Sequence, residues 1–95
     1  MAAYLIAEHL ISDAALFAQY RDQVAPMIAR HGGRYITRGG THEILDGTWQ
    51  PHRVVVIEFP DMTALKAWFH SPEYEPLIAL RRAAATDVLI AIEGA

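Results

Sequence analysis

Two charged side chains, Arg38 and Glu58, are the first candidates for chemistry in this sequence. A carboxylate can act as a general base, and a guanidinium can stabilise the negative charge that proton removal leaves on a substrate. If the loop of residues 46–52 joins two antiparallel strands, Leu45 lies opposite Arg53. This register brings Glu58 close to Gly40 and diagonally close to Arg38. The two side chains then either bind and deprotonate a small carboxylate or enolate, or form a buried ion pair that fixes the strand register.

His9 is a candidate ligand-binding residue and proton carrier. We expect the strand that contains it to run parallel to the strand of residues 53–59, so that Glu8 and His9 end near Glu58. A neighbouring carboxylate would raise the pKa of His9. The alternative is that one of Glu8 and His9 is solvated and the other is hydrogen-bonded in the core.

Trp68, His70 and Tyr74 are three further ligand-binding candidates, because they flank a break at residues 71–72. A helix that restarts there leaves backbone N–H groups that favour an anion. These side chains form either a pocket mouth or a packed aromatic corner capped by Ser71.

The five histidines do not form a recognisable metal site. His42 and His52 face each other if the hairpin forms, but HxH and HExxH spacings are missing and no third ligand is indicated. Phosphate-binding glycine loops and the Gly-x-Ser-x-Gly element are also missing. We therefore predict no metal and no cofactor.

Four strands and two helical regions must position these side chains. Residues 4–11 and 53–59 are apolar, β-branched runs, and residues 86–93 form a similar run at the end of the chain. Residues 34–45 predict one long strand bent at a glycine bulge at 39–40. Ser12 or Asp13 can cap the first helix, and Asp61 can cap the second. The first helix must end by residues 32–33, and the second restarts with Ser71 as its cap and Pro72 in its first position.

The order strand, helix, strand, strand, helix, strand predicts a ferredoxin-like α+β sandwich, in which a four-stranded antiparallel sheet has helices on one face. The strand of residues 53–59 and the last strand are apolar on both of their sides. Two copies that pack their open sheets together would bury the second side, so we predict a homodimer.

Composition narrows the possible partners. The 95 residues suit one domain, residues 1–95, and carry a formal net charge of −3, which offers no basic surface for nucleic acid. There is no cysteine for a disulfide or a thiolate site. The sequence has neither a signal-peptide pattern nor an apolar run long enough for a membrane span. We expect a cytoplasmic protein with no nucleic-acid and no membrane partner.

Four blocks of this sequence, at residues 32–40, 45–51, 53–60 and 68–74, together resemble the family called domain of unknown function 1330, in the dimeric α+β barrel superfamily. The resemblance covers essentially the whole chain. This sequence departs from the family pattern at Asp13-Ala14, where Asp-Pro is common in the family. It implies the ferredoxin-like fold and a dimer; relatives in the superfamily include small monooxygenases, lactone isomerases and haem enzymes, which use different sites on one scaffold.

Two function classes follow. In the first, a homodimer binds a small organic acid or phenolic compound. It is then a cofactor-free enzyme that catalyses proton transfer or oxygenation of this compound. In the second, the dimer is a non-enzymatic ligand sensor or structural module, and the same polar residues only stabilise the fold. A cavity of a few hundred Å³ at Arg38 and Glu58 would favour the first class, and a filled interior the second.

Overall fold

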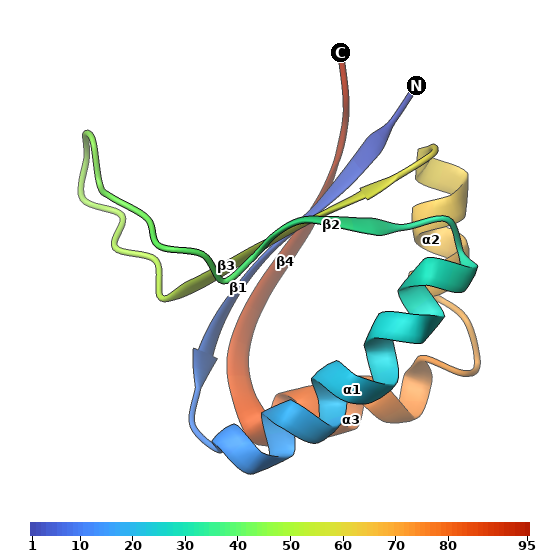
Figure 1. The fold of residues 1–95 in the computed structure, drawn as a ribbon, viewed down its shortest axis with the longest axis horizontal. Coiled ribbons are helices and arrows are strands. Elements are labelled where there is room, and N and C mark those ends of the chain that lie inside the picture. Colours follow the sequence, from blue (N-terminus) through green and yellow to red (C-terminus); the bar gives the residue numbers. More distant parts are fainter.

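A four-stranded sheet forms one layer of the molecule, and three helices cover one of its two faces (Figure 1). The structure is a computed structural model that describes residues 1–95. Along the chain the elements are β1 (Ala3–Ile11), α1 (Ala14–Arg30), β2 (Arg34–Arg38), β3 (Arg53–Phe59), α2 (Met62–Phe69), α3 (Glu75–Ala84) and β4 (Ala85–Glu93). The order expected from the sequence is confirmed, with the second helical region divided in two.

All neighbouring strands in the sheet, ordered β2-β3-β1-β4, are antiparallel. The expected parallel pairing of β1 with β3 is wrong. The crossover through α1 makes β2 run in the same direction as β1, and the connection after β2 reverses the chain, so β3 runs opposite to β1. As a result Glu58 lies opposite Tyr4, while Glu8 lies opposite Val54 at the other end of the strand pair.

The helix boundaries follow from local hydrogen bonds. The Asp13 carboxylate accepts from the Leu16 N–H, and the Asp61 carboxylate accepts from the Ala64 N–H, which confirms both predicted N-caps. Helix α1 continues through Pro26 and ends at Arg30, just before Gly32 with its φ of +81°. The restart at Ser71 is displaced: residues 71–74 form a turn in which Ser71 Oγ accepts from the Tyr74 N–H, and α3 begins only at Glu75.

The core lies between the sheet and the helices. Alternate residues of β1 and β3 point toward the helices and are buried, whereas their neighbours face away. The core consists of Ala3, Leu5, Ala7, Phe17, Tyr20, Val24, Met27, Ile28, Val55, Ile57, Phe59, Leu65, Trp68, Tyr74, Leu77, Ala84 and Ala85. No helix combines the length and apolarity that crossing a membrane would need.

Strand β2 is shorter than predicted, and its bulge is in a different place. The ladder with β3 is irregular between Tyr35 and Thr37, and β2 ends at Arg38. Residues 39–52, which we call the arm, contain no strand and project away from the body of the molecule (Figure 1). Glu8 holds the base of the arm, since its carboxylate accepts from Trp49 Nε1 at 3.3 Å and from the His52 N–H at 3.2 Å.

Candidate functional site

A cavity lies between the helix-facing side of the sheet and α1. Its walls come from β1, α1, β2, β3, α2 and β4, and its volume is about 30 Å³, room for about one or two water molecules. Apolar side chains form most of the wall, and the polar members are His9, Tyr20, Arg21, Tyr35, Arg38, Arg53 and Trp68. An apolar lining with a few polar groups is usual in small-molecule sites, although such sites enclose about 300–1,000 Å³.

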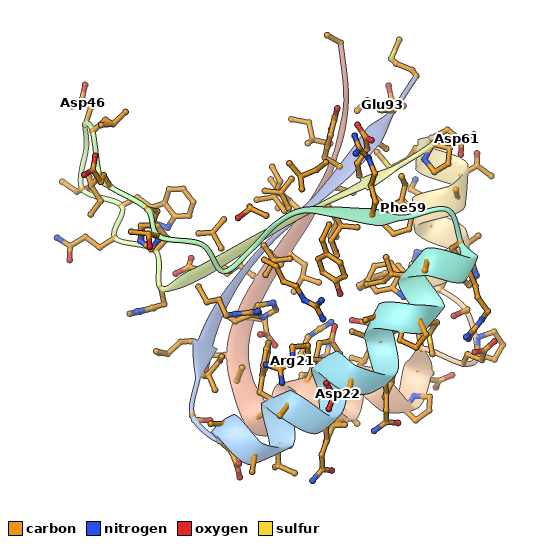
Figure 2. All side chains as sticks on the ribbon, viewed as in Figure 1. Arg21, Asp22, Asp46, Phe59, Asp61 and Glu93 are labelled. Atoms are coloured by element: carbon orange, nitrogen blue, oxygen red, sulfur yellow. The ribbon has the colours of Figure 1, made fainter.

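Three arginines share this cavity, and two of them have no carboxylate partner. Arg38 stacks over the Tyr35 ring at 4.3 Å, and Arg53 lies 5.1 Å from the centre of the Phe17 ring. Arg21 has a loose exposed contact with the neighbouring Asp22 at 3.6 Å, and Figure 2 places Arg21 on the side of α1 that faces the sheet. The cavity wall therefore holds positive charge that the protein itself does not neutralise.

The electrostatics of Arg53 reflect this crowding of positive charge. Burial lowers the pKa of its guanidinium, and repulsion from Arg21 and Arg38 lowers it further. An arginine nevertheless stays protonated at neutral pH. A bound anion would relieve both costs, because it would pair with Arg53 and screen it from the other two cations.

Gly39 makes room for the Arg53 side chain. Its φ of +73° lies in the left-handed region that favours glycine, and a Cβ there would come within 2.6 Å of Arg53 Nε. The glycine predicted to form a bulge therefore ends β2 and lets the backbone pass close to an arginine of the cavity.

A chain of buried polar side chains begins at the His9 wall of the cavity. His9 Nδ1 lies 2.5 Å from Asp87 Oδ1, and Arg81 Nε donates to Asp87 Oδ2 at 3.0 Å. Arg81 Nη1 donates to the Tyr74 hydroxyl at 2.6 Å, and this hydroxyl is 2.8 Å from that of Tyr20. Because Asp87 and Arg81 neutralise each other, the network accommodates His9 without a charge of its own.

The neutral form of His9 is favoured by its surroundings. Burial lowers its pKa most strongly, the Asp87 carboxylate opposes this shift, and the cations of Arg53 and Arg81 add to it. In the neutral ring Nδ1 donates its proton to Asp87, which leaves the Nε2 lone pair available.

Trp68 provides an unsatisfied donor in the same wall. The residue is fully buried, and its Nε1 is the one buried side-chain nitrogen or oxygen without a hydrogen-bond partner. Leaving such a donor unpaired costs about 1–3 kcal/mol. Trp68 lines the cavity, so an acceptor oxygen of a ligand that reached Nε1 would remove this cost.

The predicted meeting of Arg38 and Glu58 is wrong. Arg38 pairs with Val55 and lines the cavity, whereas Glu58 pairs with Arg34 and lies on the opposite, bare face of the sheet. The residues of the arm form no ladder, so the turn at residues 46–47 does not set the register of β2 on β3.

Glu58 belongs to a separate polar cluster. Its carboxylate accepts from Arg34 Nε at 2.7 Å and from the Tyr4 hydroxyl at 3.0 Å. These two hydrogen bonds lower the pKa of Glu58, that of Arg34 first. The contacts tie β2, β3 and β1 together on the bare face, which is a structural role.

The aromatic candidates around residues 71–72 are only partly together. Trp68 and Tyr74 pack with their ring centres 4.4 Å apart and are fully buried. His70 is exposed at the end of α2 and packs edge-on against Phe69, outside the cavity. Trp68 and Tyr74 thus form a packed aromatic corner, which was one of the two alternatives. Of the three candidates, only Trp68 lines the cavity.

Sequence reasoning missed Asp87, Arg81, Arg53 and Tyr20 as members of the site. The sequence pattern could have identified two of them. Arg81 follows buried Tyr74 and Leu77 at helical spacing, and Asp87 lies between Ala85 and Leu89 in the set of alternate β4 residues that face the helices. A charge at a core-facing position implies a buried partner.

A second hollow lies beneath the arm and is larger than the cavity, at about 530 Å³. Arm residues 40–51 provide most of its lining, with Thr37 and Val54 from the sheet. It has no arginine in its lining, and no buried polar atom within it lacks a partner. Charge and unsatisfied hydrogen bonding therefore favour the smaller cavity as the ligand site.

Several solved structures share this fold. A protein of unknown function from Rhodopseudomonas palustris, RPA0582, has 20% identity and a TM-score of 0.81 over 99% of this chain and 82% of its own. SnoaB, a cofactor-independent oxygenase from Streptomyces nogalater, has 18% identity and a TM-score of 0.69 over 99% and 93% of the two chains. A dimeric ferredoxin-like protein of unknown function from Jannaschia sp. CCS1 has 11% identity and a TM-score of 0.65 over 99% and 100%. These likenesses confirm the ferredoxin-like fold.

Sequence comparison gives the family. No curated protein matches the chain significantly. A family profile, in contrast, matches residues 2–95, nearly the whole chain. This match confirms the resemblance found in the sequence blocks: the chain belongs to the family described as Domain of unknown function (DUF1330).

Proposed function

We propose that this protein is a homodimer that binds a small organic acid or phenol in the cavity beneath the sheet. Arg38 and Arg53 would pair with the anionic group, and the buried Trp68 Nε1 would donate to an oxygen of the ligand. On such a ligand the site supports cofactor-free chemistry, either proton transfer or oxygenation.

One observation supports this proposal above the others: a mostly apolar cavity contains three arginines, of which Arg38 and Arg53 have no carboxylate partner. Of these, the partly buried cation of Arg53 is unfavourable beside an apolar space in the empty protein and would be stabilised by an organic anion. The volume of about 30 Å³ holds no organic molecule, so a ligand must displace side chains of the cavity wall. Arg38 and Arg21 are exposed and can turn outward.

The proposed cofactor-free chemistry depends on the side chains of the cavity, and one neighbour of the same fold is described as having such chemistry. SnoaB is described as a cofactor-independent oxygenase. At 18% identity this likeness concerns the fold alone, so the proposed chemistry for our chain depends on its own cavity. His9 supplies a base there without a metal or cofactor.

The homodimer is proposed from the bare face of the sheet. Val56 of β3, Ile6 of β1 and Ile90 of β4 lie side by side across three strands, and Val88, Ile90 and Ile92 are each at least half exposed. An apolar sheet face of this kind usually packs against another surface. Structurally similar proteins from Jannaschia sp. CCS1 and Bacteroides fragilis are described as dimeric.

A second candidate function is a dimeric structural or ligand-sensing module without chemistry. The observation that favours it is the small volume of the cavity, together with the hydrogen bonds that join Asp87, Arg81 and Tyr74 to one another. In that case the arginines bind a regulatory anion or only line the core.

Thermal shifts with benzoate, 2-oxobutyrate and phenol test the proposed binding. A ligand at about ten times its Kd stabilises the folded protein by about 1.4 kcal/mol, which raises Tm by roughly 5–10 °C for a chain of this size. We expect Arg38→Gln to abolish the shift produced by the carboxylates. Arg82→Gln is the matched control, because Arg82 is exposed on α3 outside the cavity.

Equal shifts in both variants, or no shift with any of the three compounds in the wild-type protein, would contradict binding at the cavity. A shift with benzoate and 2-oxobutyrate but no turnover in any assay would favour the sensing module.

A further inference from the structure

We propose that His9 Nε2 is a general base that removes a proton from a carbon next to a carbonyl group in a small organic anion, and that Asp87 is the residue that positions it. The inference depends on the proposed function, since the same cavity must first bind the anion. It adds the substrate class, a 2-oxo acid or a related carbonyl compound, and the atom that receives the proton.

The orientation of the His9 ring is fixed from one side. Asp87 Oδ1 holds Nδ1, and Asp87 is held in turn through its other oxygen by Arg81, whose guanidinium also donates to Tyr74. The side chains of His9, Asp87 and Arg81 are all at most 5% exposed. A base held by a carboxylate that is itself held in place is the usual arrangement for a positioned imidazole.

The other ring nitrogen, Nε2, is free of protein hydrogen bonds. Nε2 has no hydrogen-bond partner in the protein, yet it is not among the buried atoms that lack one, so it keeps some accessible surface. His9 belongs to the wall of the cavity beneath the sheet. The proposed ligand would meet the lone pair of Nε2 from this cavity.

Charged and titratable groups face His9 from four elements. Asp87 of β4 favours its protonated form, whereas Arg81 of α3 and Arg53 of β3 disfavour it. From α1, Tyr20 and Arg21 line the same cavity. Burial raises the pKa of the Tyr20 phenol, so it carries no negative charge near neutrality. The base is thus unprotonated before the reaction, as its role requires.

The proton-transfer step balances without an oxidant or a metal. The substrate C–H bond breaks, an Nε2–H bond forms, and the electron pair moves into the carbonyl group to give an enolate. The enolate oxygen gains a hydrogen bond from Trp68 Nε1 or charge stabilisation from Arg53, while Asp87 stabilises the imidazolium. The proton then returns from Nε2 to the same carbon or to a neighbouring position, which restores neutral His9.

Exchange of the C3 hydrogens of 2-oxobutyrate for deuterium, followed by proton NMR in D₂O near neutral pH, measures this step directly. We expect wild-type protein to accelerate exchange above the rate in protein-free buffer. His9→Gln should reduce the protein-dependent rate by about 100-fold or more, the range for loss of a general base. His70→Gln, an exposed histidine outside the cavity, should leave the rate unchanged.

The variant Asp87→Asn tests whether Asp87 positions His9 or only stabilises the fold. The measurement is the pH dependence of the exchange rate. Without the carboxylate His9 loses the group that raises its pKa, so the acid limb of the rate profile should move to lower pH. The maximal rate should fall as well, because the ring is less well oriented. A lower rate with an unmoved profile would overturn the positioning role of Asp87.

The outcomes separate this inference from the proposed function. If 2-oxobutyrate stabilises the protein but its exchange is no faster than in buffer, His9 is not the base and the proposed binding stands. If none of the three compounds binds, both fail.

A measurement on the wild-type protein covers the case in which the variants do not fold. Nitrogen NMR of the imidazole near neutral pH should report a neutral His9 with its proton on Nδ1. A protonated ring, or a proton on Nε2, would overturn the inference.

Discussion

At the scale of single residues, the buried Asp87–Arg81 pair is the strongest constraint on the interior. Both side chains are at most 5% exposed, so each would be costly to bury alone. Burial, with the cations of Arg53 and Arg81, favours the uncharged form of His9, and Arg81 Nη1 also donates to the Tyr74 hydroxyl. Stability and the candidate chemistry therefore share the same side chains.

Replacing Arg81 by Met should lower the free energy of unfolding by about 3–5 kcal/mol, because Asp87 is left buried without its cation. Urea denaturation followed by circular dichroism measures this change. The next residue offers the control: Arg82 is exposed and forms no ion pair, so Arg82→Met should change stability by less than about 0.5 kcal/mol. Equal effects of the two substitutions would show that the buried pair has no special role.

Residue-level prediction from the sequence was limited by long-range pairing. Arg38, His9 and Trp68 were identified as candidates and share one cavity. Glu58 was assigned to Arg38 and not to Arg34. The reason is the register shift between Tyr35 and Thr37, which no local sequence pattern reveals. Asp87 and Arg81 come from adjacent elements, and only the tertiary fold brings them to His9.

At the scale of elements, the sheet has two apolar faces and only one set of helices. The strand patterns predicted this imbalance, because alternation along β3 and β4 leaves apolar residues on both sides. The length of β2 could not be predicted: residues 41–45 are as β-compatible as residues 34–37, yet they pair with nothing and belong to the arm.

The bare face gives a prediction about assembly. Light scattering at micromolar concentration should report twice the 10.6 kDa mass of the chain. Ile90→Asp, which places a charge at the middle of the bare face, should yield particles of 10.6 kDa. Ala83→Asp, on the exposed side of α3, should remain dimeric. A wild-type protein that scatters as a single chain would contradict the proposed dimer.

At the scale of the whole molecule, the two faces of the sheet have different roles. The helix-covered face contains the cavity, the arginines and His9, and the bare face contains the apolar surface with the Glu58 cluster. The cavity is thus built within one chain, and the proposed dimer leaves it accessible from the side of α1. The arm stands apart from both, with Asp46 at its tip (Figure 2).

The most direct test of the central claim, that an organic anion binds beneath the sheet, is a titration of the ¹⁵N-labelled protein with 2-oxobutyrate followed by amide chemical shifts. We predict that the shifted resonances cluster at His9, Arg21, Arg38 and Arg53, around the cavity. Arm residues 41–50 and the exposed positions of β4 should stay unchanged. Shifts confined to the arm, where the larger hollow lies, or to the bare face would contradict the account.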